Sequence, residues 1–202
     1  VQQHFQARLL GRELSEDELV AAFRAAWVSE GFLSREHEEE RLRSGEELLR
    51  RFHRQDAAAP LRHTAVEQEF GFWVGRNKVV GRYDLVVERD GQVAVLDFKT
   101  GGVDSEPAAR ERVEESLQLD VYALAQLRTR RRLPDRVELR FLESGLRAGR
   151  RPTLERAEAC EALVRETAGR IRRREFAARA SWRACSQCVF RDICPHTARM
   201  EG

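Results

Sequence analysis

Alternating hydrophobic and polar positions in the middle of the chain predict three strands, near residues 64–74, 78–88 and 93–98. Asp90 and Gly91 separate the second and third of these segments, and this dipeptide is typical of a two-residue hairpin turn. Asn77 and Lys78 are expected to turn the first segment into the second. The pattern therefore predicts a run of antiparallel strands at the centre of the chain.

Helical patterns surround this central region. Ser15 and Glu18 form a capping-box pattern that predicts the start of a helix running through Trp27 and Val28. Further helices are expected at residues 1–10, 35–54, 108–130 and 153–176, with one more strand at 136–142. This order predicts an α/β fold in which a central mixed sheet is flanked by helices.

The composition fits one domain with a small appendage. The 202 residues are 42% hydrophobic and 35% charged, and the net charge is only +2. No apolar run reaches the roughly 18 residues of a membrane span, and no signal-peptide pattern is present. We therefore expect a cytoplasmic, nucleoid-associated protein without a membrane partner. Because the chain begins at Val1 within a predicted helix, we expect it to be part of a larger protein.

Arginine clusters are a second feature of the composition. They lie at residues 128–132, 147–151 and 170–174. Such clusters can follow the phosphates of a nucleic acid, but each one alone is interpreted as a solvated surface.

Two aspartates are predicted to face each other across the hairpin. If its turn is centred on Asp90 and Gly91, paired residue numbers sum to 181, as 90 and 91 do, and Asp84 faces Asp97. Opposed Cβ atoms lie about 4.5–5.5 Å apart, where two ionised carboxylates repel each other. A divalent cation would remove this conflict because hard cations bind carboxylate oxygens. Lys99 shares the strand parity of Asp97, so the three groups predict a metal-dependent phosphodiesterase site, with an ordinary charged strand face as the alternative.

Three motifs extend this pattern: Gly81-Arg82-Tyr83-Asp84, Asp97-Phe98-Lys99-Thr100-Gly101 and Gln118-Leu119-Asp120-Val121-Tyr122. In this order they resemble the PD-(D/E)XK nucleases of the RecB type, and the resemblance covers nearly the whole chain, from His4 to His196. It implies a restriction-endonuclease-like core with an N-terminal helical segment and a C-terminal cysteine-bearing tail. The implied segments are residues 1–62, the nuclease core at 63–180 and the tail at 181–202.

The resemblance also implies roles for the motif residues. Mg²⁺ or Mn²⁺ would be held by Asp84, Asp97 and the backbone carbonyl of Phe98, and Lys99 would orient the attacking hydroxide or stabilise negative charge. Gln118 and Tyr122 lie four residues apart on one helix, so their side chains share a face. Gln118 is expected to touch a metal-bound water or a phosphate, and Tyr122 to line the nucleic-acid path.

Three more residues are further candidates for this site. His4 matches the upstream histidine of RecB-type nucleases and would be a further metal ligand, with a surface histidine as the alternative. Arg82 is expected to contact nucleic acid. Glu67, at the start of the first strand, is interpreted as a surface residue, with a water-mediated metal contact as the alternative.

The tail contains three clustered cysteines, Cys185, Cys188 and Cys194. Their spacing is similar to that of the iron–sulfur branch of the family, which includes AddB-type helicase–nucleases, CRISPR-associated exonucleases and nucleases fused to UvrD-like helicases. A [4Fe–4S] cluster needs a fourth cysteine, which this chain lacks upstream of the core. Either that ligand precedes Val1 in a longer protein, or His196 completes a Cys₃His zinc site. Cys160, in a predicted helix, is interpreted as a buried residue.

The sequence thus predicts a Mg²⁺- or Mn²⁺-dependent deoxyribonuclease, acting as a single-strand exonuclease. By resemblance it would be the nuclease domain of a helicase–nuclease in DNA repair and recombination, with a helicase domain or subunit as its partner. The alternatives are a nuclease-like domain that binds DNA or scaffolds a repair complex without cleaving, and a restriction- or transposon-type endonuclease.

Overall fold

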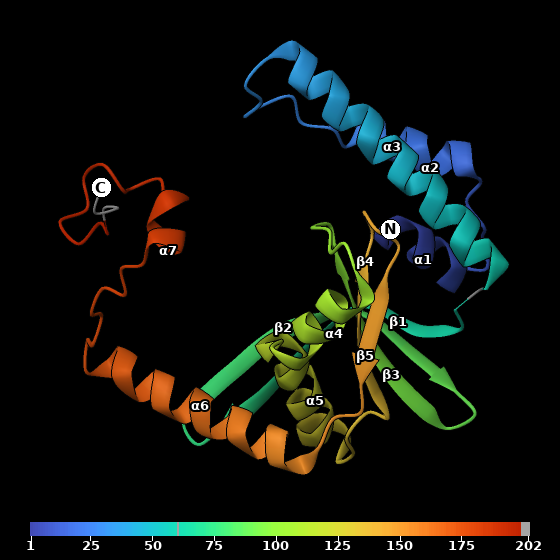
Figure 1. The fold of residues 1–202 in the computed structure, drawn as a ribbon. Helices are drawn as coiled ribbons and strands as arrows, with labels where there is room; N and C mark the ends of the chain where they lie inside the picture. Colours follow the sequence, from blue (N-terminus) through green and yellow to red (C-terminus); the bar gives the residue numbers. More distant parts are fainter. Residues whose placement is uncertain (60, 199–202) are drawn as a thin grey trace. The chain divides into compact units, whose positions relative to one another are not determined.

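The computed structural model describes residues 1–59 and 61–198, and the chain divides into two compact units, Val1–Ala162 and Leu163–Gly202. The first unit contains a five-stranded sheet in the order β1-β2-β3-β4-β5 (Figure 1). The strands are β1 (His63–Val74), β2 (Asn77–Arg89), β3 (Gln92–Lys99), β4 (Arg136–Phe141) and β5 (Arg147–Arg150). All neighbours are antiparallel except β3 and β4, which are parallel. The predicted α/β fold with a mixed sheet flanked by helices is confirmed.

The turn between β2 and β3 has the predicted position. Asp90 and Gly91 both have positive φ angles, +51° and +75°, as a two-residue turn of type I′ requires. Leu85 pairs with Leu96 and Val86 with Val95, so paired numbers sum to 181. The predicted register of this hairpin is therefore observed.

The turn between β1 and β2 lies earlier than predicted. It contains Gly75 and Arg76, with Gly75 at a φ of +58° that favours glycine. Asn77 is already the first residue of β2, and its side-chain amide donates a hydrogen bond of 3.1 Å to the carbonyl of Val74. Placing the turn at Asn77 and Lys78 was therefore wrong, because the residue that adopts positive φ is Gly75.

Three N-terminal helices lie together on one side of the sheet, with α1 next to β1: α1 (Gln2–Leu9), α2 (Glu16–Ala25) and α3 (Arg35–Ala58) (Figure 1). The predicted capping box opens α2, because the Ser15 side chain accepts from the Glu18 amide and the Glu18 carboxylate accepts from the Ser15 amide. Buried side chains of these helices meet β2 and β3 in one hydrophobic cluster, formed by Phe5, Leu19, Leu49, Phe52, Leu85 and Leu96.

Two shorter helices, α4 (Glu106–Glu114) and α5 (Leu117–Arg130), replace the single helix predicted at 108–130. The helices are interrupted between Glu114 and Leu117, and the Ser116 hydroxyl caps α5 by accepting from the amide of Leu119 at 3.3 Å. On α5, the Tyr122 ring packs against Phe70 and Tyr83 of the β1–β2 hairpin. This packing fixes the side of α5 that faces the sheet.

The C-terminal helices are α6 (Leu154–Arg172) and α7 (Trp182–Ser186). The boundary between the two units falls within α6, at Ala162 and Leu163, whereas the predicted segments end at 62 and 180. Residues 199–202 of the predicted tail lie outside the described residues. Within the described ranges, no helix has both the length and the hydropathy that crossing a membrane requires.

Candidate active site

Four residues predicted from the motifs meet where β3 ends. The buried Asp97 carboxylate accepts two hydrogen bonds at Oδ1, from Gln118 Nε2 at 2.6 Å and from the Tyr122 hydroxyl at 3.1 Å. Its other oxygen, Oδ2, lies 2.7 Å from the ammonium nitrogen of Lys99. Lys99 in turn donates to Gln118 Oε1 at 2.6 Å. The four side chains form one connected polar network.

The secondary structure explains this convergence. Asp97 and Lys99 are two residues apart on β3, so they project from the same face of the strand. Gln118 and Tyr122 are four residues apart on α5, so they project from the same face of the helix. Gln118 also donates to the Tyr122 hydroxyl at 2.7 Å, which places its amide between the phenol, the carboxylate and the ammonium.

Asp84 reaches the same region from β2. The pairing of β2 and β3 begins at Leu85 and Leu96, and beyond it Asp84 Oδ2 accepts a hydrogen bond of 2.9 Å from the backbone amide of Phe98. A side-chain carboxylate thus takes the place of a backbone acceptor at this end of the ladder. Because the N–H and C=O of one strand residue point to the same side, the Phe98 carbonyl also faces β2.

The electrostatic environment of Asp84 favours a nearby cation. Burial raises the pKa of this carboxyl above its usual value, and the negative charges of Asp97 and Glu67 raise it further. The Phe98 amide and the Lys99 ammonium lower this pKa, but less strongly. Burial and the charge of Asp97 also raise the pKa of Tyr122, so its hydroxyl remains a neutral donor to Asp97.

Glu67, which the sequence suggested was a surface residue, lies beside Asp84 and Phe98. Its backbone has a φ of +50°, unusual for a residue with a side chain, at the point of β1 bracketed by the pairs Val66–Leu85 and Gln68–Tyr83. Its carboxylate lines the same cavity of about 210 Å³ as Asp84 and Phe98. The sequence signal that could have found Glu67 is the turn at Gly75 and Arg76. A turn centred there pairs residues whose numbers sum to 151, which places Glu67 opposite Asp84.

The chemistry of this region fits a divalent cation. Asp97 Oδ2 is buried and receives no hydrogen bond of standard geometry from the described residues, although it lies near Lys99. Asp84, Asp97 and the Phe98 carbonyl supply only oxygen donors, which suit Mg²⁺ or Mn²⁺ rather than a metal that prefers thiolate or imidazole. In the described part of the chain, no three histidine, cysteine, aspartate or glutamate side chains are gathered closely enough to hold a metal on their own. Backbone and water oxygens would therefore complete the coordination.

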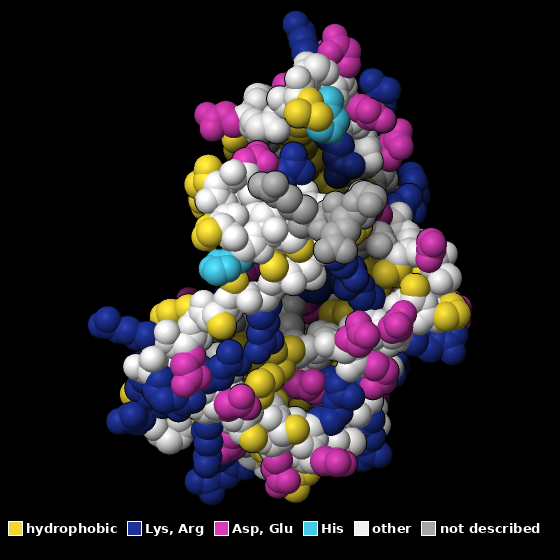
Figure 2. All heavy atoms as spheres, turned by 60° about the vertical axis from the view of Figure 1, so that its left-hand side comes forward, with side chains coloured by type: hydrophobic (Ala, Val, Ile, Leu, Met, Phe, Trp, Pro, Cys, Tyr) yellow, Lys and Arg dark blue, Asp and Glu magenta, His cyan; other side chains and the backbone are white. Residues whose placement is uncertain are grey.

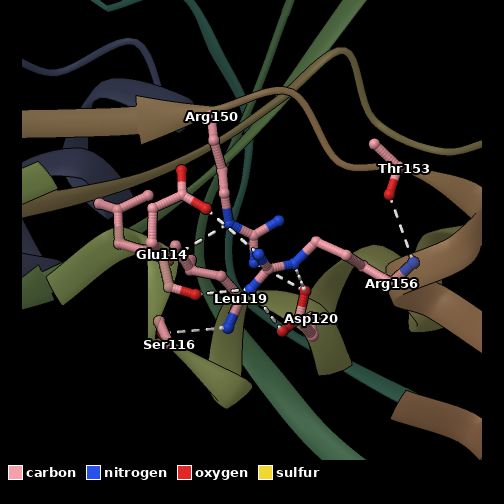
Figure 3. Close-up of polar contacts among 8 residues, drawn as sticks. Glu114, Ser116, Leu119, Asp120, Arg150, Thr153 and Arg156 are labelled. Carbon is pink, nitrogen blue, oxygen red and sulfur yellow. Dashed lines mark hydrogen bonds and ion pairs between the residues drawn. The ribbon is translucent and has the colours of Figure 1, made fainter. Parts of the chain in front are cut away.

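Charged side chains also hold α5 on the side of the helix that faces away from Gln118 and Tyr122. Figure 3 shows Arg150 and Arg156 pointing at Asp120, which lies between Gln118 and Tyr122 in the sequence. Arg150 Nη2 donates to Asp120 Oδ1 at 2.6 Å, and Arg156 Nε donates to the same oxygen at 3.0 Å.

The same arginines satisfy the end of α4. Arg150 donates to the carbonyl of Val113 at 3.2 Å, and Arg156 donates to the carbonyl of Glu114. These carbonyls belong to the last turn of α4, where acceptors have no partner within the helix. The prediction that the arginines at 147–151 are solvated is therefore wrong for Arg150. This residue lies on β5, is only 8% exposed, and holds α4 and α5 in place.

His4 is not brought together with the carboxylates. It is buried, and its Nε2 lies 2.9 Å from Asp56 Oδ2 on α3, where Arg8 forms a second ion pair. The residues that line the cavity beside Asp84 from this side are Gln2 and Phe5 of α1 and the preceding Val1. The predicted ligand set that includes His4 is therefore not assembled in the structure, because its ring faces α3.

The three tail cysteines are free and half-buried, and the described residues contain no metal-binding group that includes them. Cys185 Sγ instead accepts a hydrogen bond of 3.4 Å from the amide of Ala198, and His196 is exposed. The structure therefore does not support the predicted iron–sulfur cluster or its zinc alternative. Cys160 is buried on α6, as expected, and burial raises the pKa of its thiol to about 11.

The comparison with family models agrees with the motifs. A sequence profile described as the PD-(D/E)XK nuclease superfamily matches residues 1–195. A solved structure named "Crystal structure of SSO0001" is similar with a TM-score of 0.47 and 14% sequence identity, covering 91% of this chain and 95% of that one. The comparison with curated proteins found no match.

Proposed function

The chain belongs to the PD-(D/E)XK nuclease superfamily, and on that premise we propose that it is a Mg²⁺- or Mn²⁺-dependent nuclease that hydrolyses phosphodiester bonds in single-stranded DNA. The observation that carries the proposal is the network of Asp97, Lys99 and Gln118, with Asp84 electrostatically coupled to it. The finer assignment, an exonuclease that works with a helicase in DNA repair and recombination, rests on the motif resemblance.

Asp84, Asp97 and the Phe98 carbonyl would hold the cation, with Glu67 close enough to act through a water molecule. Bound there, a divalent cation lowers the pKa of a coordinated water and neutralises charge on the scissile phosphate. The protein's own contribution is to hold both carboxylates in fixed positions. The Phe98 amide holds Asp84, while Gln118 and Tyr122 hold Asp97.

Lys99 supplies positive charge beside the reacting phosphate. Its ammonium is held by Asp97 and Gln118, and its side chain is 39% exposed, so it is both positioned and accessible to substrate. A fixed positive charge stabilises the negative charge that develops in the transition state without a reorganisation cost. Gln118 orients both members of the Asp97–Lys99 ion pair, since its amide nitrogen donates to Asp97 and its amide oxygen accepts from Lys99.

The test is cleavage of 5′-labelled single-stranded DNA with Mg²⁺ or Mn²⁺ by the wild type, Asp97→Ala and Lys99→Ala. We expect Lys99→Ala to lower the rate by about 10²–10³-fold, Asp97→Ala to lower it at least as much, and EDTA to abolish cleavage. Asp90→Asn, which keeps the positive φ of the exposed turn in the same hairpin, is the matched control and should cleave normally. Equal DNA loss in all four proteins would falsify the proposal. Retained DNA with tight binding would instead favour a non-cleaving DNA-binding domain.

A further inference from the structure

The β1–β2 hairpin extends past the rest of the sheet. The pairs that β2 forms with β3 begin at Leu85, whereas the pairing of β1 and β2 continues to Val74 and Asn77 (Figure 1). One face of this extension packs on α5 through Phe70 and Tyr83. The opposite face, which we call the hairpin face, carries every second residue of each strand: Glu69, Gly71 and Trp73 of β1, and Lys78, Val80 and Arg82 of β2.

Large side chains are exposed on the hairpin face. Trp73 is 62% exposed and Val80 is 68% exposed, and Trp73 lies directly opposite Lys78. A shallow groove of about 640 Å³ runs along this face, lined in part by Gly71, Lys78, Val80 and Arg82. Because Gly71 has no side chain, the groove reaches the strand backbone there.

The groove leads towards the candidate active site. Arg82 Nε forms an ion pair of 2.6 Å with Glu67 Oε2, and Glu67 lines the same cavity as Asp84. On β2, Arg82 and Asp84 are separated by one residue. A chain lying along the hairpin face would therefore reach Arg82 and Glu67, beside Asp84.

The charge of the hairpin changes along its length. Near the site, Arg82 is balanced by Glu67 and faces Glu69. From residue 70 to residue 81 the sequence contains no acidic residue, although the chain has 34 of them, and it contains Arg76 and Lys78. The part of the chain that the structure describes offers neither cation an ion-pair partner. By contrast, basic and acidic side chains are interspersed over the face drawn in Figure 2.

We propose that the hairpin face binds the single-stranded DNA that the active site cleaves, an inference that rests on the proposed nuclease function. An exposed indole provides a stacking surface for an unpaired base, and cations on either side of it can contact the flanking phosphates. A duplex keeps its bases stacked on one another, so it cannot use Trp73 in this way. The hairpin therefore selects single strands and directs them along β2 towards Asp84.

The experiment measures binding of a fluorescent oligo-dT in EDTA, where no cleavage occurs, by fluorescence anisotropy at several salt concentrations. Trp73→Ala should weaken binding by about 5- to 150-fold, the effect of losing one stacked base, and Trp73→Phe should restore part of it. Lys78→Ala should make the slope of log K against log salt shallower by about 0.7. Arg89→Ala, at the other end of β2, is the matched control and should bind like the wild type.

Two further readouts separate stacking from a loss of folding. In a Trp27→Phe/Trp182→Phe background, where Trp73 is the remaining tryptophan, oligo-dT should quench its fluorescence. With Mg²⁺, the Trp73→Ala variant should raise KM with little change in kcat. A blunt duplex should bind wild type and Trp73→Ala equally. Circular dichroism checks that each variant is folded.

The inference is overturned if oligo-dT does not bind the wild type, or if Trp73→Ala and Lys78→Ala bind it as tightly as Arg89→Ala does. It is also overturned if Trp73→Ala only abolishes self-association, which would assign the face to a second copy of the chain. If the wild type cleaves DNA while the hairpin variants bind normally, only this inference fails. If the hairpin binds single strands but no cleavage occurs with Mg²⁺, the proposed nuclease function fails instead.

Discussion

Removing the Asp120 carboxylate tests whether its ion pairs with Arg150 and Arg156 hold α5, and with it the candidate active site, in place. In Asp120→Ala, Arg150 loses its carboxylate partner while its side chain is only 7% exposed. Breaking a buried ion pair by deleting one partner costs about 3–5 kcal/mol, because a charge is left unpaired in the interior. Arg156 is 35% exposed and adds little to this cost, since solvent screens it.

We therefore expect Asp120→Ala to lose about 3–5 kcal/mol of unfolding free energy, measured by urea denaturation followed by circular dichroism. For a unit of this size the loss corresponds to a decrease in Tm of roughly 10 °C. Catalysis should also slow, because Gln118 and Tyr122 lie on the same helix. Glu106→Gln is the control, since it breaks an exposed pair with Arg110 and should remain close to the wild type.

The double variant Asp120→Ala/Arg150→Met sharpens this test. It removes the unpaired charge as well as its partner, so it should be more stable than Asp120→Ala alone. A loss below about 1 kcal/mol in Asp120→Ala, or a double variant that is less stable than the single one, would refute the reasoning.

Two further changes test the packing of the first unit. Burial raises the pKa of the Asp56 carboxyl, but the hydrogen bond to His4 and nearby positive charge outweigh this effect, so the pKa lies below its ordinary value. The pair therefore stabilises the fold above about pH 3.9, the ordinary pKa of an aspartate in the unfolded chain. This stability is lost as the pH falls through the lowered pKa of the folded state. Urea denaturation should show Asp56→Asn less stable than the wild type at pH 7, with a difference that shrinks below pH 4; a constant difference would contradict this. Gly81→Ala places a Cβ 2.5 Å from the buried Phe70 ring and should cost about 1–3 kcal/mol in thermal unfolding, whereas Gly101→Ala, with open space around it, should be nearly neutral.

The parts of the fold that the sequence predicted correctly depend on local signals. Asp90 and Gly91 determine the turn, and the turn determines the register that pairs Leu85 with Leu96 next to Asp84 and Asp97, because strand pairing follows from a two-residue loop. The four-residue spacing of Gln118 and Tyr122 likewise places both on one helix face. Their meeting with Asp97 and Lys99 in space follows from the packing of α5 on the sheet, mainly against β1 and β4.

The parts that were missed depend on tertiary contacts. A helix at 108–130 looks continuous because the residues that cap the end of α4, Arg150 and Arg156, follow it by many positions in the sequence. The strand β5 has only four residues, three of them Arg, Gly and Arg, so it has no hydrophobic alternation to detect. His4 matched a motif by sequence alone, but its partner is Asp56 on α3, and no local pattern indicates that pairing.

Direct measurement of Mn²⁺ binding tests the central claim, that Asp84 and Asp97 share a divalent cation next to Lys99. Electron paramagnetic resonance of free Mn²⁺ in a protein titration gives the affinity without requiring DNA or turnover. We expect saturable binding by the wild type and by Asp90→Asn, and strongly weakened binding by Asp84→Asn and Asp97→Asn. Equal Mn²⁺ binding by all four proteins, or no binding by the wild type, would contradict the account.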